Sequence, residues 1–465
     1  MALFSFLDRD RTIAAPTYNR WRIPTAALAI HLAIGQAYAF SVFNLPLHNQ
    51  EGWKLSTIGW VFSTAIVFLG VSAALFGQWL ERVGPRKAMF TAACCFSGGF
   101  LVGAIGIRLH NFPLLLLGYG VLGGFGLGIG YISPVSTLIR WFPDRPGMAT
   151  GMAIMGFGGG AMIASPLSVR LMAHFRGPGS QGVAPTFVSL AVLYFIFMMF
   201  GVFSVRLPRP GWKPVGWTAP ATPRKLVTTA NVTVNKAMRT LPFWLLWWVL
   251  CLNVTAGIGV LGQASPMIQE MFFHGNRPAA AAGFVALLSL ANMAGRFGWA
   301  SLSDYIGRKA TYATFFILGM ALYAFVPHTG QMQSVALFVL AFVVILSMYG
   351  GGFSTIPAYL KDLFGTMHVG AIHGRLLTAW SAAGIFGPVL VNYIREYQIN
   401  RGVPKADAYS VTMYLMACLL FVGLICNWLV RPVLARHYFT GEMNVPDTPK
   451  AGGTSITGTP EGQNV

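Results

Sequence analysis

Long apolar segments recur along the whole chain and alternate with short polar ones. Each apolar segment is close to the roughly 20 residues that a helix needs to cross a bilayer. Residues 1–22 are polar and carry no cleavable signal pattern, and the first apolar segment is long enough to span the membrane and remain there. We therefore predict an all-α membrane protein with twelve transmembrane helices, at about residues 23–43, 57–80, 89–107, 113–138, 147–169, 186–204, 242–264, 280–302, 311–327, 334–359, 376–394 and 408–430.

The composition supports this prediction, because 55% of the residues are hydrophobic and only 10% are charged, against about 25% charged in soluble proteins. The net charge of +19 would suit a nucleic-acid partner, but its distribution indicates topology instead. With a cytoplasmic N-terminus, 23 Lys and Arg fall in cytoplasmic segments and 8 in outside loops. This positive-inside pattern predicts a multi-pass cell-membrane protein with both termini in the cytoplasm, and we expect a bacterial inner membrane.

Cysteines and acids give no sign of a cofactor. All five cysteines lie inside apolar segments without metal-ligand spacing, so we predict neither a disulfide nor a metal. An enzyme would call for paired acids, histidine clusters or a nucleophile with its base on the membrane face, and the sequence has none of these. We expect no enzyme activity, no cofactor and no nucleic-acid partner, and a monomeric protein in the lipid bilayer.

The sequence contains an internal repeat. Glu81 and Gly84 recur as Asp304 and Gly307, at a constant offset of 223 residues. Further proline and glycine positions follow at an offset of 223 or 222: Pro134 and Pro357, Gly151 and Gly374, Pro166 and Pro388. The repeat predicts two six-helix halves. The predicted regions are an N-terminal segment (1–22), an N-terminal bundle (23–204), a basic cytoplasmic linker without acids (205–240), a C-terminal bundle (241–433) and a disordered cytoplasmic tail (434–465).

Two related loops carry a family resemblance. Gly77-Gln-Trp-Leu-Glu81-Arg82-Val-Gly84-Pro85-Arg86-Lys87 and Asp304-Tyr-Ile-Gly307-Arg308-Lys309 resemble the signature loop of the major facilitator superfamily. The resemblance implies two six-helix bundles that rock about a central site near the bilayer midplane.

The chemistry of these loops suits a gate. The acid can face a helix N-terminus, and an arginine can pair with an acid or with helix C-terminal carbonyls. Ordinary cytoplasmic loop charge explains the basic residues but not the repeated acid and glycine. Three departures from the pattern are Glu81 in place of Asp, the inserted Pro85, and Ala300 in place of the leading glycine. The gating candidates are Gly77, Glu81, Gly84, Arg86, Asp304, Gly307 and Arg308.

Arg296 is the most unusual residue, because it is a cation inside the apolar segment 279–302, which contains no acid. Asp304 follows eight residues later, roughly 12 Å along a helix. A guanidinium at this depth is costly unless it faces protein, water or an anion; snorkelling to the interface is the alternative. Asn292 lies one turn from Arg296 on the same helix face, and Ser289 one turn further. Both are candidates for substrate contact or for interhelical hydrogen bonding.

The segment Asn292-Met-Ala-Gly-Arg296-Phe-Gly298 resembles helix 8 of the oxalate/formate antiporter family and the related monocarboxylate transporters. The stretches around Tyr131, Tyr349 and Trp380 agree with it. The resemblance implies that Arg296 pairs with a substrate carboxylate, for which a planar guanidinium is well suited. The oxalate exchanger of this family also has a lysine in helix 11, and this sequence has none there.

The candidate substrate-binding residues are Arg296, Asn292, Tyr131, Tyr349, Trp380, Tyr38 and Gln36. The aromatic members could equally pack against aliphatic neighbours. His31, in the middle of the first helix, is a candidate proton carrier or a structural histidine.

We therefore predict a secondary active transporter of small organic anions by alternating access, with monocarboxylates such as formate, lactate or pyruvate favoured by the single buried cation. Symport with a proton and antiport against a second anion both remain open. The alternatives are an oxalate/formate-type dicarboxylate exchanger and a transporter-like nutrient sensor.

Overall fold

The computed structural model describes residues 5–218, 226–228, 230–261, 264–273 and 278–439. This part of the chain is helical, and its only β structure is three isolated bridges. Eleven of its helices are long and apolar enough to cross a membrane. α12 (Pro278–Ile306) has 29 residues and takes the place of the eighth predicted helix. At about 1.5 Å per residue it is also long enough to span a bilayer about 30 Å thick.

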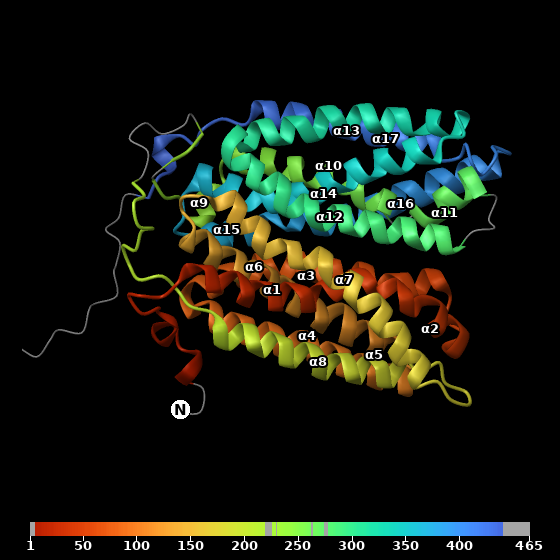
Figure 1. Ribbon diagram of the computed structural model, residues 1–465, viewed down its shortest axis with the longest axis horizontal. Helices are drawn as coiled ribbons and strands as arrows, with labels where there is room; N and C mark the ends of the chain where they lie inside the picture. The colour runs from red at the N-terminus through yellow and green to blue at the C-terminus, as the bar shows by residue number, and fades with distance from the viewer. Residues whose placement is uncertain (1–4, 219–225, 229, 262–263, 274–277, 440–465) are drawn as a thin grey trace, which may run out of the picture.

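The helices form two groups, one on each side of a central boundary (Figure 1). We call them the N-terminal half and the C-terminal half. The N-terminal half contains α1 (Ile23–Ile34), η4 (Gly35–Phe43), α2 (Asn44–Glu51), α3 (Leu55–Val83), α4 (Pro85–Arg108), α5 (Phe112–Leu115), η5 (Leu116–Gly123), α6 (Gly124–Trp141), α7 (Pro146–His174) and α8 (Val183–Ser204). The C-terminal half contains α9 (Val234–Met238), α10 (Leu241–Leu261), α11 (Ala264–Ile268), η6 (Gln269–Phe273), α12, α13 (Arg308–Gln331), α14 (Val335–Phe364), α15 (Val369–Leu376), α16 (Thr378–Asn400) and α17 (Ser410–Leu429).

The linker and the two ends of the described chain lie at the same end of the molecule, which we call the linker end. Leu207 N–H donates to the Thr12 carbonyl at 2.8 Å, and Phe439 N–H donates to the Asn231 carbonyl at 2.8 Å. Residues 435–437 form a short 3₁₀ helix. The remainder of the predicted disordered tail, 440–465, lies outside the described residues.

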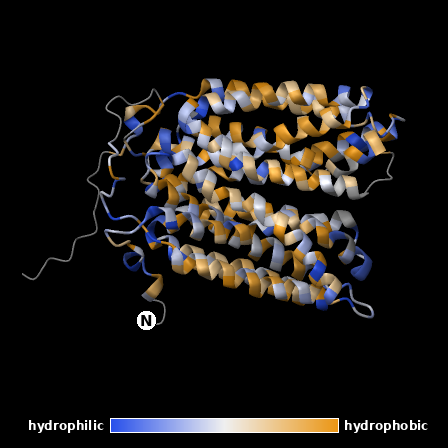
Figure 2. Cartoon of the chain, in the orientation of Figure 1, coloured by the Kyte–Doolittle hydropathy of each residue, from blue (hydrophilic) through white to orange (hydrophobic). Residues whose placement is uncertain are grey.

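Apolar side chains cover much of the outer surface. Large hydrophobic residues from most of the long helices are exposed there, among them Leu75, Ile105, Phe200, Ile317 and Phe421. Hydrophobic residues follow the helices along their length, whereas hydrophilic residues gather at the two ends (Figure 2). A soluble monomer rarely exposes so much contiguous apolar surface. The exposed belt identifies the surface that faces lipid.

The predicted signature loops are mostly helical, which corrects the boundaries expected from the sequence. α3 continues through Gly77 and Glu81 to Val83, and α12 continues through Asp304 to Ile306. Each helix ends at a glycine with positive φ, +85° at Gly84 and +90° at Gly307. Glycine adopts this backbone conformation without steric cost, and the next helix begins at the following residue. Each predicted loop is therefore a one-residue turn between two helices.

Three of the membrane crossings depart from regular α-helix. The first contains nine residues of 3₁₀ helix, Gly35–Phe43, a length that is uncommon for this conformation. The fourth contains the π-helical segment η5. The eleventh is divided at Leu377 into α15 and α16, so it begins at Val369, seven residues earlier than predicted. These departures matter because they place several of the candidate site residues.

Candidate functional site

Arg296 lies on α12 with none of its side chain exposed. Its Nε donates a hydrogen bond to Asn292 Oδ1 at 2.8 Å, the contact expected between residues four apart on a helix. Nη1 and Nη2 make no hydrogen bond of ordinary geometry among the described residues, and the Tyr38 and Tyr131 hydroxyls lie close enough to interact with the guanidinium. The guanidinium carbon lies 5.5 Å from the Phe157 ring centroid and 5.2 Å from that of Phe353. The cation is therefore held by one amide and two aromatic faces, with two donor groups available to a ligand.

Aromatic residues from both halves surround this cation. Trp380 on α16 contacts Phe353 with ring centroids 4.4 Å apart and Phe157 at 5.5 Å. Tyr131 on α6 lies 5.4 Å from Trp380. Phe157 on α7 belongs to the N-terminal half, whereas Arg296, Phe353 and Trp380 belong to the C-terminal half. The site therefore lies on the boundary between the two halves.

Four predicted aromatic site residues lie in this cluster. Tyr38 and Tyr349 approach each other across the boundary with hydroxyl oxygens 3.4 Å apart. The charge of Arg296 acts on the side chains of Tyr38, Tyr131 and Tyr349. Trp380 is fully buried, and its Nε1 has no partner among the described residues. These side chains supply hydroxyl and indole groups next to the guanidinium.

Two other predicted residues point elsewhere. Gln36 accepts a hydrogen bond from the Tyr119 hydroxyl at 2.9 Å, inside the N-terminal half. Ser289 donates to the Val285 carbonyl of its own helix at 3.1 Å. The structure therefore gives these two side chains local partners and no contact with Arg296.

His31 is completely buried on α1 and packs edge-on against Tyr131, with ring centroids 5.3 Å apart. His373 on α15 is also buried, and its ring centroid lies 6.0 Å from that of Tyr131. The sequence analysis missed His373 because it placed the start of helix 11 at residue 376. The repeat contained the missing signal, since Gly374 corresponds to Gly151, which lies inside a predicted helix.

Asp304 forms the most direct contact between the halves at the linker end. Its carboxylate accepts hydrogen bonds from Gly147 N–H at 2.9 Å and Met148 N–H at 2.8 Å, the first turn of α7. Arg308 donates to the same carboxylate at 2.5 Å and to Asp362 at 3.2 Å. A negative charge at a helix N-terminus is stabilised by the free N–H groups and the helix dipole.

Glu81 makes the related contact in the opposite direction. Its carboxylate accepts from Gly370 N–H at 3.2 Å, in the first turn of α15, and forms an ion pair with Arg140. Gly147 and Gly370 differ by 223 residues, as do Glu81 and Asp304. Each half therefore presents an acid to the equivalent helix N-terminus of the other half.

The remaining gating candidates have structural contacts nearby. Arg86 donates to the carbonyls of Phe6 at 2.8 Å and Val205 at 3.3 Å, and Val205 caps the C-terminus of α8. A Cβ atom at Gly77 would lie only 2.7 Å from the Ala371 Cα, so this glycine allows α3 and α15 to approach.

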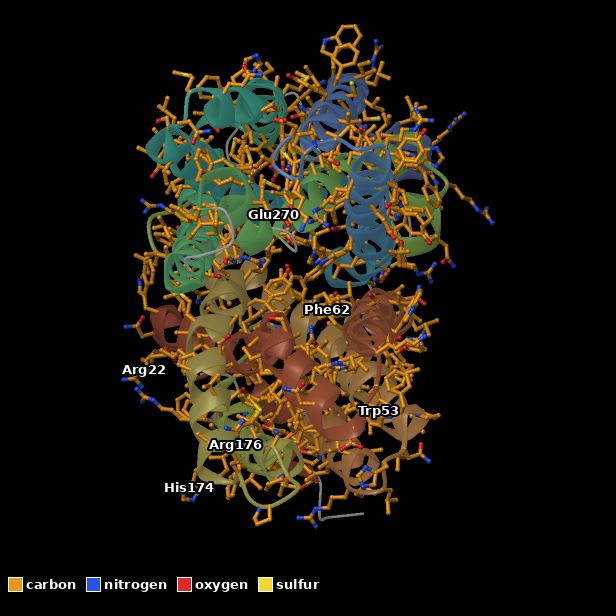
Figure 3. The ribbon with its side chains drawn as sticks, turned by 90° about the vertical axis from the view of Figure 1, so that its right-hand side faces the viewer. Arg22, Trp53, Phe62, His174, Arg176 and Glu270 are labelled. Carbon is orange, nitrogen blue, oxygen red and sulfur yellow. The ribbon has the colours of Figure 1, made fainter. Side chains whose placement is uncertain are left out.

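Contacts between the halves continue from the linker end toward the centre. Thr150 donates to the Ser354 carbonyl at 2.6 Å, and Ser381 donates to the Val67 carbonyl at 3.0 Å. α7 and α12 pack together over this part and separate toward the opposite end (Figure 1). Viewed from that opposite end, Glu270 and Phe62 lie on either side of the boundary (Figure 3). The halves are thus joined at the linker end.

Comparisons with known proteins agree with this architecture. Residues 26–388 match the family model described as Major Facilitator Superfamily. The chain is 26% identical to the oxalate:formate antiporter of Oxalobacter formigenes, covering 79% of this chain and 83% of the relative. It is 22% identical to human monocarboxylate transporter 11, covering 87% and 82%. Both resemblances predicted from the sequence are confirmed at this level.

A solved structure confirms the predicted fold. The proton:xylose symporter XylE superposes with a TM-score of 0.67 at 15% identity, covering 88% of this chain and 96% of that chain. The family model covers most of the sequence. The chain is a multi-pass membrane protein and belongs to the major facilitator superfamily of transporters.

Proposed function

We propose that this protein carries small monocarboxylate anions such as formate, lactate or pyruvate across the membrane by alternating access, and that Arg296 binds the carboxylate. The observation that carries the proposal is the buried guanidinium whose Nη1 and Nη2 make no hydrogen bond of ordinary geometry among the described residues. An unneutralised charge at this depth costs several kcal/mol, about the scale of the penalty for burying an ion. A carboxylate can accept from both Nη groups in a bidentate pair and offset that cost.

The surroundings of Arg296 favour a small anion with one carboxylate. Among the described residues, Arg296 is the one Lys or Arg whose charge acts on His31, Tyr38, Tyr131 and Tyr349. One guanidinium compensates one carboxylate, so the second charge of oxalate would lie among aromatic rings. The relatives named above include an oxalate:formate antiporter, so oxalate is the alternative substrate to test.

Alternating access follows from the position of the site on the boundary between the halves. The contacts of Asp304 and Glu81 with opposing helix N-termini would hold the linker end closed, and their release would expose the site to that side. The positive-inside distribution supports a cytoplasmic linker end with both termini on that side. A nutrient sensor would keep this binding site but would not move the anion.

Counterflow in proteoliposomes tests the proposed function. Liposomes loaded with formate, L-lactate, pyruvate or oxalate are diluted into the same labelled anion, and uptake is compared for the native protein, Arg296→Lys and Arg296→Gln. We expect monocarboxylate counterflow by the native protein and at least a tenfold loss in both variants, since losing one charge-assisted hydrogen bond costs about 1.5–3 kcal/mol.

Arg170→Lys is the matched control, because Arg170 is exposed on α7 and far along the helix from the site. It should transport like the native protein. Undiminished counterflow in Arg296→Lys would refute bidentate binding. If oxalate exchanges faster than every monocarboxylate, the proposed substrate is wrong and oxalate takes its place. If the anion binds but shows no counterflow, the protein is a sensor rather than a carrier.

A further inference from the structure

Two buried histidines lie next to one tyrosine of the binding site. Tyr131 contacts the His31 ring at 5.3 Å and the His373 ring at 6.0 Å between centroids. The histidines come from opposite halves, α1 and α15. His31 also lies within electrostatic range of Arg296. The carboxylate anchor and the two imidazoles are therefore parts of one continuous cluster.

The free nitrogen atoms of these histidines are available to a proton. His31 Nδ1 lies 3.1 Å from the Ala27 carbonyl, which can only accept, so Nδ1 carries the hydrogen of the neutral ring. His31 Nε2 then holds a lone pair, and no hydrogen bond of ordinary geometry reaches it from the described residues, although the His31 ring lies close to the Tyr131 backbone. Both nitrogens of His373 likewise have no partner within that part of the chain, and the Tyr131 hydroxyl lies close to the Arg296 guanidinium without a hydrogen bond of ordinary geometry. Buried polar groups are usually paired, so this concentration points to a ligand or a proton.

The internal repeat separates this pair from ordinary helix packing. His373 corresponds to Thr150 and Tyr131 to Ser354, each at the offset of 223. Thr150 and Ser354 meet across the boundary and form a plain hydrogen bond at 2.6 Å. The equivalent position on the other side of the pseudo-twofold axis holds an imidazole against a phenol. At the Thr150–Ser354 position a hydroxyl and a carbonyl are enough to join the two halves. Helix packing therefore does not by itself require a histidine and a tyrosine at the equivalent position.

The other ionisable groups near the cluster come from several helices. Tyr131, Tyr38 and Tyr349 face it from α6, η4 and α14, and Arg296 faces it from α12. Tyr194 lies on α8, which packs against α1, and Cys251 lies on α10, which packs against α15. The charged side chains on helices packed against α15 are engaged at the linker end: Glu81 with Arg140, Asp362 with Arg308 and Lys361, and Lys236 with the Tyr438 carbonyl. No acid of the described residues makes a hydrogen bond or ion pair with either histidine.

We propose that His31 and His373 form a proton-binding site that is coupled through Arg296 to the carboxylate, so that one anion and one proton cross together. This inference rests on the proposed function. A proton on His31 places a second positive charge beside Arg296, and like charges repel. A carboxylate bound to Arg296 neutralises the guanidinium and removes the repulsion. Anion binding therefore favours protonation, and by linkage protonation favours anion binding to the same degree.

The proton moves without a covalent step. It binds the lone pair of a histidine nitrogen when the anion enters and leaves the same nitrogen when the anion departs on the other side. The cargo of one carboxylate and one proton has no net charge. His31 and His373 lie on opposite halves, so rocking changes their separation and the exposure of the proton site together with that of Arg296.

Proton flux in proteoliposomes tests this inference on the native protein. Liposomes contain a trapped pH-sensitive dye, and the external probe is whichever of L-lactate and pyruvate gives the larger counterflow. We expect anion addition to acidify the lumen, and an imposed pH difference of one unit, acid outside, to support accumulation up to about tenfold. Counterflow without acidification or accumulation overturns the proton site and leaves the proposed function intact. Absence of counterflow in the native protein overturns both.

Variants identify the residues. His31→Gln, His373→Gln and the double variant should retain counterflow, which needs no net proton movement, and should lose acidification and pH-driven accumulation. His328→Gln is the matched control, because His328 is exposed on α13, and it should behave as the native protein. Full proton coupling in the double variant would refute the assignment. If one variant lacks counterflow, proton coupling is measured in the single-substitution variant that retains it. Loss of counterflow in both single variants would contradict the inference that the histidines bind the proton and not the anion.

Discussion

We expect Asp304→Asn to release the linker end. In the native protein the carboxylate accepts hydrogen bonds from Gly147 N–H at 2.9 Å and Met148 N–H at 2.8 Å, and it carries the charge that favours the α7 N-terminus. Asparagine keeps one acceptor oxygen and loses the charge. Hydrogen bonds to charged groups contribute about 1.5–3 kcal/mol each, and the helix dipole adds about 0.3–1 kcal/mol. The closed arrangement should therefore lose about 2–3 kcal/mol, a roughly 30- to 150-fold shift in the closed-to-open equilibrium.

The shift can be measured as a distance distribution between spin labels on the two halves. Lys87 on α4 and Arg431 after α17 are exposed at the linker end and suit labelling in a cysteine-free background. We expect a second, longer distance to appear or grow in Asp304→Asn. Glu81→Gln should shift the distribution less, because its carboxylate accepts only one N–H across the boundary, at 3.2 Å.

Asp144→Asn is the matched control, since Asp144 also pairs with an arginine at the linker end but within one half, with Arg20 at 2.7 Å. Its distance distribution should equal that of the native protein. If Asp304→Asn leaves the distribution unchanged, or if Asp144→Asn changes it equally, the cross-boundary capping contacts do not hold the halves together and the reasoning is wrong.

Two further predictions concern packing and pH. A Cβ at Gly374 would lie 2.1 Å from the Ala73 carbonyl across the boundary, so Gly374→Val should abolish counterflow with little change in melting temperature. A Cβ at Gly128 would lie 2.1 Å from the Leu69 carbonyl within the N-terminal half. Gly128→Val should therefore lower the melting temperature, because overpacking costs about 1–3 kcal/mol. Equal melting temperatures for the two variants would contradict this. His368 lies between α14 and α15, and burial lowers its pKa more than the charge of Glu81 raises it. The unfolded chain therefore binds the extra proton below about pH 6.5, and the contribution of His368 to stability is present above that pH and lost as the pH falls. His368→Gln should reduce the fall in melting temperature between pH 7 and pH 5, while His328→Gln should not.

The sequence was sufficient to predict those features that depend on local pattern. Apolar length predicted the helices, and the spacing of four predicted the bond between Arg296 and Asn292. Gln36 shows what local pattern does not contain. It lies in a 3₁₀ segment, which has about 3.0 residues per turn rather than 3.6, so a 3.6-residue period does not describe its direction. The contact of Gln36 with Tyr119 depends on how η4 and η5 pack, and sequence periodicity does not contain that information.

The repeat explains which parts of the site belong to the scaffold and which are specific to one half. Phe157 and Trp380 are 223 residues apart and face each other at 5.5 Å, so the pseudo-twofold axis passes between them. The backbone of Arg296 closely approaches Gly151, as the backbone of Ala73 approaches Gly374. Arg296 and Ala73 are thus equivalent positions with the same packing role, and only one carries a charge.

A buried cation on one half alone would have a mechanical consequence in a carrier of anions. Two arginines related by the axis would face each other across the boundary and repel, which would oppose closure around a single carboxylate. With Arg296 on the C-terminal half and Tyr131 on the N-terminal half, a bound carboxylate instead connects unlike groups from the two sides. The anion would thereby attract the halves to each other, and closure would depend on the substrate. This dependence is what a carrier needs to avoid cycling empty, and it arises because the repeated scaffold holds different side chains at equivalent positions.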